Sequence, residues 1–198
     1  VRILVGDAQH AAVCADFHDP FHLPQPRITP RRNVVYFPGS TIGNLEFQGA
    51  HRLLTTMRRI ACQGGAALIG VDLIKDQRVL EAAYNDAQGV TAAFNLNILT
   101  RLNREFGADF DVESFEHRAV WDPERHRMEM RLVSRRTQSV VVDGERFELT
   151  EGEHILTEYS HKYSLDMFAN LARNADFHVE HVWTDAQRLF SVQYLVAD

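Results

Sequence analysis

Hydrophobic residues form two short continuous runs in the first half of the chain, at Val34–Phe37 and Ala66–Val71. Such runs, bounded by turn residues, are typical of strands buried on both faces of a parallel sheet. The first run ends in Pro38-Gly39, and a segment of small residues then leads to Asn44. Ligands bind at the carboxyl edge of an open α/β sheet, so Gly39 and Gly43 predict a loop that a ligand approaches closely. The same pattern is also typical of a plain turn without a ligand.

The residues between the two runs follow the period of an amphipathic helix, predicted over Phe47–Cys62. Its inward face carries Leu53, Leu54, Met57 and Ile60. Gln63-Gly64-Gly65 ends this helix, because glycine adopts the left-handed conformation at a helix end without strain. Strand, helix and strand in this order predict a βαβ unit with parallel strands and a right-handed crossover.

Two more helices are predicted downstream, at Arg78–Tyr84 and Thr91–Phe106. The inward face of the longer helix carries Phe94, Ile98, Leu99 and Leu102. Beyond Gly107, apolar and polar residues alternate, which is typical of antiparallel strands with one face in water. The predicted strands are Phe115–Val120, Arg127–Ser134, Ser139–Val142 and Arg146–Leu149. Asp143-Gly144 predicts a tight hairpin between the last two of these strands.

The last part of the chain returns to an amphipathic helix at Leu165–Ala175, followed by strands at Phe177–Trp183 and Phe190–Val196. A terminal helix and strand pair suits a return to the parallel sheet. We therefore predict an α/β fold, in which an α+β block separates two parts of one sheet.

Composition excludes several classes of function. The 198 residues include 45% hydrophobic and 24% charged residues, as in a globular domain of ordinary size. The net charge is −6 and basic residues are scattered, so we expect no nucleic-acid partner. No apolar run is long enough to cross a bilayer and no signal peptide opens the chain, so we expect a cytoplasmic protein without a membrane partner. Cys14 and Cys62 are expected to be reduced.

Common catalytic and cofactor motifs are missing from the sequence. It contains no nucleophile elbow, P-loop, zinc-ligand spacing or glycine-rich dinucleotide fingerprint. His18 and His22 have the spacing of two metal ligands on a helix, but Pro20 and Pro24 argue against a helix there, so we expect no metal site. The chain begins at Val1 in what reads as the middle of a fold. A cofactor-binding glycine loop, which normally follows the first strand, is therefore expected upstream.

Polar residues near the ends of predicted elements are candidates for a binding site, each with a structural alternative. Asn44 offers an amide donor and a carbonyl acceptor to a carboxylate or zwitterion, or it caps the following helix. Asp16 can accept a hydrogen bond from an adenine amino group while Phe17 packs on the ring, or it is simply an acid in a loop. Tyr84 ends a helix, where a core tyrosine with a satisfied hydroxyl is the more common case.

Glu158 and Ser160 lie two residues apart on a segment predicted to be extended, so their side chains point to the same side. A carboxylate and a hydroxyl in this arrangement can hold the two nitrogens of an imidazole, one as a donor and one as an acceptor. The alternative for Ser160, shared with Ser164, is capping of the last helix.

Several longer segments, taken in order, resemble one known family. They are Gly39-Ser40-Thr41-Ile42-Gly43-Asn44, Asp72-Leu73-Ile74-Lys75-Asp76, Ala83-Tyr84-Asn85-Asp86, Gly89-Val90-Thr91-Ala92-Ala93-Phe94-Asn95, Asn103-Arg104-Glu105-Phe106-Gly107-Ala108-Asp109-Phe110, Arg127-Met128-Glu129-Met130 and Thr157-Glu158-Tyr159-Ser160-His161-Lys162-Tyr163. Over nearly its whole length the chain is similar to the histidine-specific S-adenosylmethionine-dependent methyltransferases of the ergothioneine pathway. Members of this family trimethylate the α-amino group of L-histidine to give hercynine.

The resemblance implies a cofactor, S-adenosylmethionine, and residues that bind it. Asp16 and Phe17 match the pair that contacts its adenine. Asn44 and Tyr84 match the residues that hold the carboxylate of histidine, with Thr91 close by.

The resemblance also implies how the imidazole ring is recognised. Glu158 and Ser160 match the pair that reads the ring, and Met130 lines the same pocket. No catalytic side chain is implied, because direct methyl transfer needs an oriented neutral amine and no covalent enzyme intermediate.

In domain terms, the resemblance implies that residues 1–74 belong to a Rossmann-like methyltransferase sheet. Residues 75–160 would form an inserted α+β substrate-binding domain, and 161–198 would return to the sheet. We expect a monomer with L-histidine as its small-molecule partner. The family's cofactor loop, its ribose-binding acid and a tyrosine near the substrate amine would precede Val1. A paralogue that methylates another amino acid or amine, and a fragment that binds a ligand without catalysis, stay open as alternatives.

Overall fold

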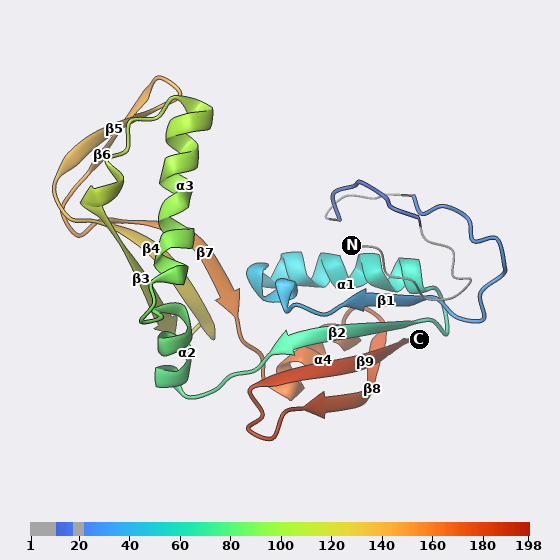
Figure 1. The fold of residues 1–198 in the computed structure, drawn as a ribbon. Coiled ribbons are helices and arrows are strands. Elements are labelled where there is room, and N and C mark those ends of the chain that lie inside the picture. The colour runs from blue at the N-terminus through green and yellow to red at the C-terminus, as the bar shows by residue number, and fades with distance from the viewer. Residues whose placement is uncertain (1–10, 18–21) are drawn as a thin grey trace.

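The computed structural model describes residues 11–17 and 22–198, and its elements gather into two groups (Figure 1). His18, one of the two histidines considered as metal ligands, lies outside the described residues. One group is a sheet with two helices, and the other is a block that leaves this sheet after β2 and returns to it after β7. Within the described ranges, no helix is both long and apolar enough to cross a membrane.

The sheet has four strands in the order β1-β2-β9-β8, which we call the main sheet. Strands β1 (Val34–Phe37) and β2 (Ala66–Asp72) pair in parallel, and helix α1 (Phe47–Ala61) connects them. The βαβ unit predicted from the sequence is therefore present, with its parallel pairing confirmed. Burial on both faces is confirmed for most of β2 but is wrong for β1, in which Val34 and Tyr36 are exposed.

The last two strands join the main sheet, but the expected return to parallel pairing is wrong for the strand next to β2. Strand β9 (Phe190–Ala197) runs antiparallel to both β2 and β8 (Phe177–Thr184). A tight loop joins β8 to β9, and its Asp185 carboxylate accepts backbone hydrogen bonds from Leu189 and Phe190. A connection this short can join only antiparallel neighbours, so the sheet is mixed.

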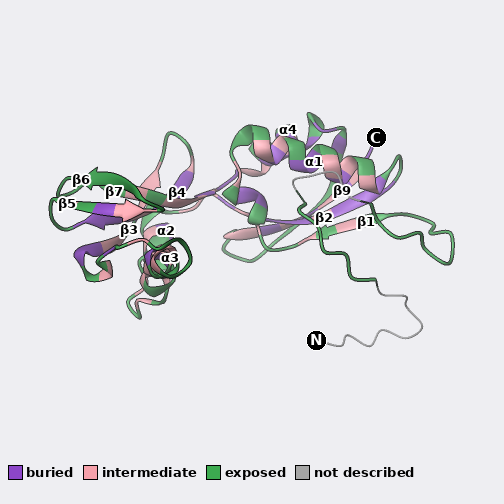
Figure 2. Cartoon of the chain, turned by 90° about the horizontal axis from the view of Figure 1, so that it is seen from above, coloured by how far each residue is buried: buried purple, intermediate pink, exposed green. Residues whose placement is uncertain are grey.

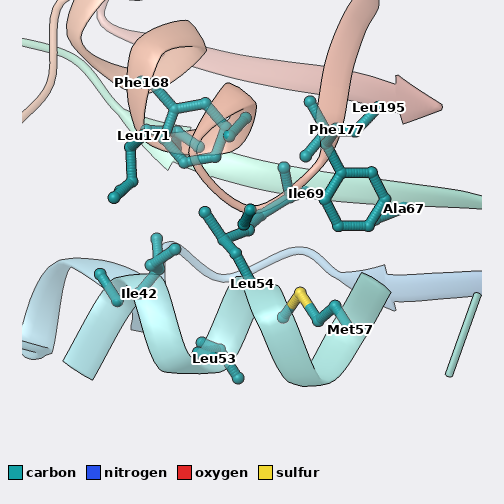
Figure 3. Packing of buried hydrophobic residues seen from close by; sticks show 14 of the residues in the cluster. Ile42, Leu53, Leu54, Met57, Ala67, Ile69, Phe168, Leu171, Phe177 and Leu195 are labelled. Atoms are coloured by element: carbon teal, nitrogen blue, oxygen red, sulfur yellow. The ribbon is translucent and has the colours of Figure 1, made fainter. Parts of the chain in front are cut away.

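Helices α1 and α4 (Leu165–Arg173) cover one face of the main sheet, as the burial colours show (Figure 2). Their apolar faces meet the inward side chains of β2 and β9 in one cluster (Figure 3). Members of this cluster include Ile42, Leu53, Leu54, Met57, Ile69, Phe168, Leu171, Phe177 and Leu195. The predicted inward stripe of the first helix is thus largely confirmed, with Ile60 only half-buried.

The second group, which we call the inserted block, runs from α2 to β7. Its helices are α2 (Gln77–Tyr84), α3 (Val90–Phe106) and the short 3-10 helix η2 (Val112–Ser114). Its strands are β3 (Phe115–Asp122), β4 (Arg127–Ser134), β5 (Gln138–Val142), β6 (Glu145–Leu149) and β7 (His154–His161).

The antiparallel sheet predicted for this block divides into two. Strands β3, β4 and β7 form one sheet, and β5 and β6 form a separate hairpin. The hairpin turn at Asp143-Gly144 is confirmed, with φ angles of 50° and 82°. Strand β7 was expected only as an extended connection, but it pairs with β4 along most of its length.

The predicted inward face of α3 is wrong at Phe94, whose side chain is 63% exposed. The neighbouring Asn95 is fully buried instead. Its amide nitrogen lies 3.0 Å from His117 Nδ1, and its carbonyl oxygen lies 2.6 Å from the Thr157 hydroxyl. A buried amide is stable only when it is hydrogen-bonded, and these partners hold Asn95 inward while Phe94 turns to solvent.

The two groups meet where β7 passes the short 3-10 helix η1 (Thr41–Asn44) after β1. A Cβ atom on Gly43 would lie 2.7 Å from the carbonyl oxygen of His161, so only glycine allows this approach. Gly43 therefore admits a strand, while Gly39 lines a cavity, and the close approach of a ligand to this loop stays a prediction. The sharp turn is made by Ser40, whose φ is 54°.

A cluster of charged side chains adds to the same junction. The guanidinium of Arg127 contacts Glu46 at 2.7 Å and Glu129 at 2.7 Å, and it stacks over the ring of Tyr159. Burial works to raise the pKa of Glu129, but hydrogen bonds from Arg131 and Arg127 outweigh it and lower that pKa. This cluster links the start of α1 to the inserted block.

We predict that Gly43→Ala lowers the free energy of unfolding by about 2 kcal/mol or more, because the added methyl group displaces the β7 backbone. Gly39→Ala is the matched control, since its Cβ would meet only Thr41 Oγ1 at 3.7 Å. We expect that variant to change stability by less than about 0.5 kcal/mol. Denaturant unfolding of the native gene product measures both, and equal effects of the two substitutions would refute this account of the junction.

Candidate functional site

A cavity of about 340 Å³, which we call the polar cavity, opens where β1 and β2 end and β7 passes them. Side chains from both groups line it: Ser40, Thr41, Asn44, Asp72, Lys75, Tyr84, Glu158, Ser160, Lys162 and Phe190. Its volume suits a small ligand. Four residues predicted as substrate ligands from separate parts of the sequence, Asn44, Tyr84, Glu158 and Ser160, therefore come together here.

Asn44 lies at the end of η1, and its side chain faces the inserted block. Its amide nitrogen donates a hydrogen bond of 2.9 Å to Glu158 Oε1. The N-cap of α1 is Glu46, so the alternative that Asn44 caps this helix is wrong. This hydrogen bond joins Asn44, which is predicted to bind the carboxylate of histidine, to Glu158, which is predicted to bind its imidazole ring.

Glu158 is half-buried on β7. Burial raises the pKa of its carboxyl, while the Asn44 hydrogen bond and the positive charge of Lys162 oppose this shift. A carboxylate in such surroundings gains from any ligand that donates a hydrogen bond to it.

Strand geometry places Glu158, Ser160 and Lys162 on the same side of the chain at the end of β7. The ammonium of Lys162 donates to Asp72 Oδ2 at 2.7 Å, to Tyr84 Oη at 2.8 Å and to Ser160 Oγ at 2.9 Å. Ser160 is thus a cavity residue, and the capping alternative applies to Ser164, which accepts from the backbone of Met167.

Tyr84 is the last residue of α2, and its half-buried phenol reaches the cavity. The carbonyl oxygen of Tyr84 lies 2.8 Å from His117 Nε2. The side-chain amide of Asn85 donates to the carbonyl oxygen of Ala119 and accepts a hydrogen bond from its backbone N–H. These bonds fix the end of α2 against β3. The phenol oxygen accepts a hydrogen bond from Lys162, and the side chain also borders the cavity.

Met130 and Thr91, which the resemblance places in or near the substrate pocket, do not line the polar cavity. Met130 pairs with Glu158 across β4 and β7 and packs into a buried cluster with Leu80, Ala119 and Met128. The backbone amide of Thr91 donates to the carboxylate of Asp86 at the start of α3. Hydrogen bonds from Thr91 and Val90 lower the pKa of Asp86 to about 2.

Phe17 lies beside a second, larger cavity of about 710 Å³. Its ring meets Phe37 edge to face, with centroids 5.9 Å apart, at the carboxyl end of β1. Asn44 lines both cavities, so they are neighbours. Asp16 precedes Phe17 but is not among the residues that line either cavity.

The sequence had not identified Lys162, Asp72 and Lys75 as site residues. Lys75 pairs with Asp72 at 2.5 Å, and the backbone amide of Asp72 donates to Ser40 Oγ at 2.9 Å. Two of these residues could have been predicted from the sequence. Asp72 ends a buried strand at the carboxyl edge of the sheet, where ligands bind. Lys162 follows Glu158 and Ser160 at a spacing of two residues, so its side chain points to the same side of the chain.

A family profile described as "Histidine-specific methyltransferase, SAM-dependent" matches residues 5–197. The chain belongs to this methyltransferase family. It is 41% identical over 187 residues to histidine N-alpha-methyltransferase of Mycolicibacterium smegmatis, covering 93% of this chain and 57% of that protein. The Mycobacterium tuberculosis enzyme of the same name is 40% identical over 180 residues, covering 88% and 54%. The chain thus spans about half the length of these relatives.

Solved structures of other methyltransferases are more distant from this family member. The CcbJ methyltransferase of Streptomyces caelestis superposes with a TM-score of 0.48 and 12% identity, over 93% of this chain and 62% of that one.

We predict that Asn44→Ala raises the pKa of Glu158 further, because the hydrogen bond from Asn44 favours the ionised carboxyl. Carbon-detected NMR titration of the Glu158 carboxyl measures this change. Thr41→Ala is the matched control, since Thr41 lines the same cavity and, within the described part of the chain, its side chain donates no hydrogen bond to Glu158. An unshifted titration in Asn44→Ala would contradict the assigned contact.

Proposed function

We propose that this chain recognises L-histidine and takes part in transferring methyl groups from S-adenosylmethionine to its α-amino group, which gives hercynine. The observation that carries this proposal is the convergence of Asn44, Tyr84, Glu158 and Ser160 on one cavity. Membership of the histidine-specific family and the relatives' names support it.

The carboxylate end of histidine would be held from the main-sheet side. Asn44 offers an amide and Tyr84 a phenol, and both are neutral hydrogen-bond donors. Lys75, which also lines the cavity, adds positive charge beside Asp72. Such a set suits an amino acid carboxylate without the desolvation cost of an extra buried ion pair.

The imidazole end would be held from β7. Glu158 accepts a hydrogen bond from one ring nitrogen, and Ser160 donates one to the other. An apolar side chain in the same place leaves these groups unpaired, at a cost of about 1–3 kcal/mol each. The polar cavity therefore favours histidine over amino acids whose rings lack nitrogen.

The described residues also fit S-adenosylmethionine as the methyl donor. The larger cavity has room for it, and the ring of Phe17 offers an apolar surface to an adenine. When bound, this group supplies an electrophilic methyl carbon on a sulfonium. Because Asn44 borders both cavities, amino acid and donor would bind side by side, so the main contribution of the chain is orientation.

The proposal includes a domain organisation. Residues 1–74 and 161–198 would form part of the methyltransferase domain, and 75–160 an inserted substrate-binding domain. Separate hydrophobic clusters support this division, one under the main sheet and two within the inserted block. Met130 and Thr91 would shape the substrate pocket from behind, with Asp16 near the adenine. We further propose a cytoplasmic monomer acting on a small molecule.

We predict that Glu158→Ala lowers the preference for histidine over phenylalanine by about tenfold or more, since one charged hydrogen bond to the ring is lost. The ratio of kcat/KM values for the two amino acids, measured with the native gene product, reports this preference. Glu148→Ala on the exposed face of β6 is the control and should keep the ratio. A ratio that Glu158→Ala leaves intact would reject the imidazole assignment.

Titration of the same protein with histidine and S-adenosylmethionine separates the remaining alternatives. Binding of both ligands together with methyl transfer supports the proposal. Binding without transfer identifies a non-catalytic binder. Preference for another amine identifies a paralogue.

A further inference from the structure

We propose that Lys162 is a positioning residue that fixes the hydroxyl groups of Tyr84 and Ser160 as hydrogen-bond donors toward the ligand. This inference rests on the proposed function, since it concerns the same cavity. It assigns a role to a buried side chain that does not itself need to touch the substrate.

The Lys162 ammonium can act only as a hydrogen-bond donor. Its side chain is 1% exposed, and its three N–H groups match the three oxygens around it, on Asp72, Tyr84 and Ser160. An ammonium carries three donors and no acceptor, so each of these oxygens must accept. The carboxylate of Asp72 supplies the opposite charge.

This arrangement sets the direction of both hydroxyl groups. The oxygens of Tyr84 and Ser160 each accept from Lys162, and each keeps one O–H to donate. Among the described residues, no acceptor takes either hydroxyl proton. Both side chains border the polar cavity, so each proton can be donated to a ligand bound there.

The cavity consequently selects ligands by the arrangement of hydrogen-bond donors and acceptors that they present. Tyr84 requires an acceptor such as a carboxylate oxygen. Ser160 requires a lone pair, while Glu158 on the same strand requires a donor. An imidazole in its neutral form satisfies the last two together, because one nitrogen carries a proton and the other does not.

A purely structural role for Lys162 makes a different prediction. Its ion pair with Asp72 also ties the end of β2 to the segment after β7. If the lysine served only to hold these segments together, its loss would weaken binding of every amino acid by a similar factor. If it directs the hydroxyl groups, its loss changes the ratio between ligands.

The test compares L-histidine with the two pyrrolylalanine isomers, whose rings keep an N–H but have no nitrogen lone pair. Binding to the native gene product and to its Lys162→Met variant is measured by calorimetry. In the native protein we expect histidine to bind about tenfold or more tightly than the better isomer, because the latter leaves the Ser160 proton unpaired. In Lys162→Met the hydroxyls can rotate, and this ratio should fall toward one.

Lys75→Met is the matched control, because Lys75 also lines the cavity and contacts Asp72 but touches neither hydroxyl. It should weaken all ligands alike and preserve the ratio. If Lys162→Met does not fold, Lys162→Gln replaces it, since a neutral amide, which can also accept a hydrogen bond, no longer forces both hydroxyl oxygens to accept.

The outcomes separate the two proposals. A native protein without preference for histidine overturns the proposed function. A native preference that survives unchanged in Lys162→Met, or in Lys162→Gln where the former is unfolded, overturns the role of Lys162 alone. A similar drop of the ratio in Lys75→Met would also overturn it, because charge loss in the cavity would then be the cause.

Discussion

The buried charge pair of Lys162 and Asp72 is the constraint on which the site depends. An ammonium removed from water is tolerated only when its charge is balanced and its donors are all used. Asp72 ends β2, Tyr84 ends α2 and Ser160 lies on β7. The three hydrogen bonds of the Lys162 ammonium therefore hold three distant segments together at one point. The close approach at Gly43 allows this convergence, since any larger residue there would hold β7 away from the main sheet.

The sequence predicted well what depends on local chemistry. The apolar run at Val34–Phe37, the stripe of α1 and the turn at Asp143-Gly144 are set by neighbours in the chain, and all three are present. Pairing between distant strands has no such local signal. The antiparallel placement of β9 and the partnership of β7 with β4 depend on which edges are free in the folded molecule, so periodicity alone did not identify them.

The errors on α3 and in the site have a common cause, which is that buried polar groups are placed by their hydrogen-bond partners and not by hydropathy. Phe94 was expected inward because it is apolar, but Asn95 holds that position through His117 and Thr157. Lys162 was overlooked because lysines are seldom fully buried, and the sequence did not show that Asp72 supplies a partner of opposite charge. The motifs did place Asn44 and Glu158 in one site, yet only the fold shows that the two contact each other directly.

That contact explains why the site is built across two groups of elements. Asn44 follows β1 of the main sheet and Glu158 belongs to the inserted block, so a ligand that contacts both bridges the two groups of elements. Under the proposed function, the groups that recognise the imidazole ring lie on β7 over the buried methionines of β4, and Asn44 in the loop after β1 borders the larger cavity. Substitutions on β4 and β7 would then change which side chain is recognised more than they change how the donor is held beside the main sheet.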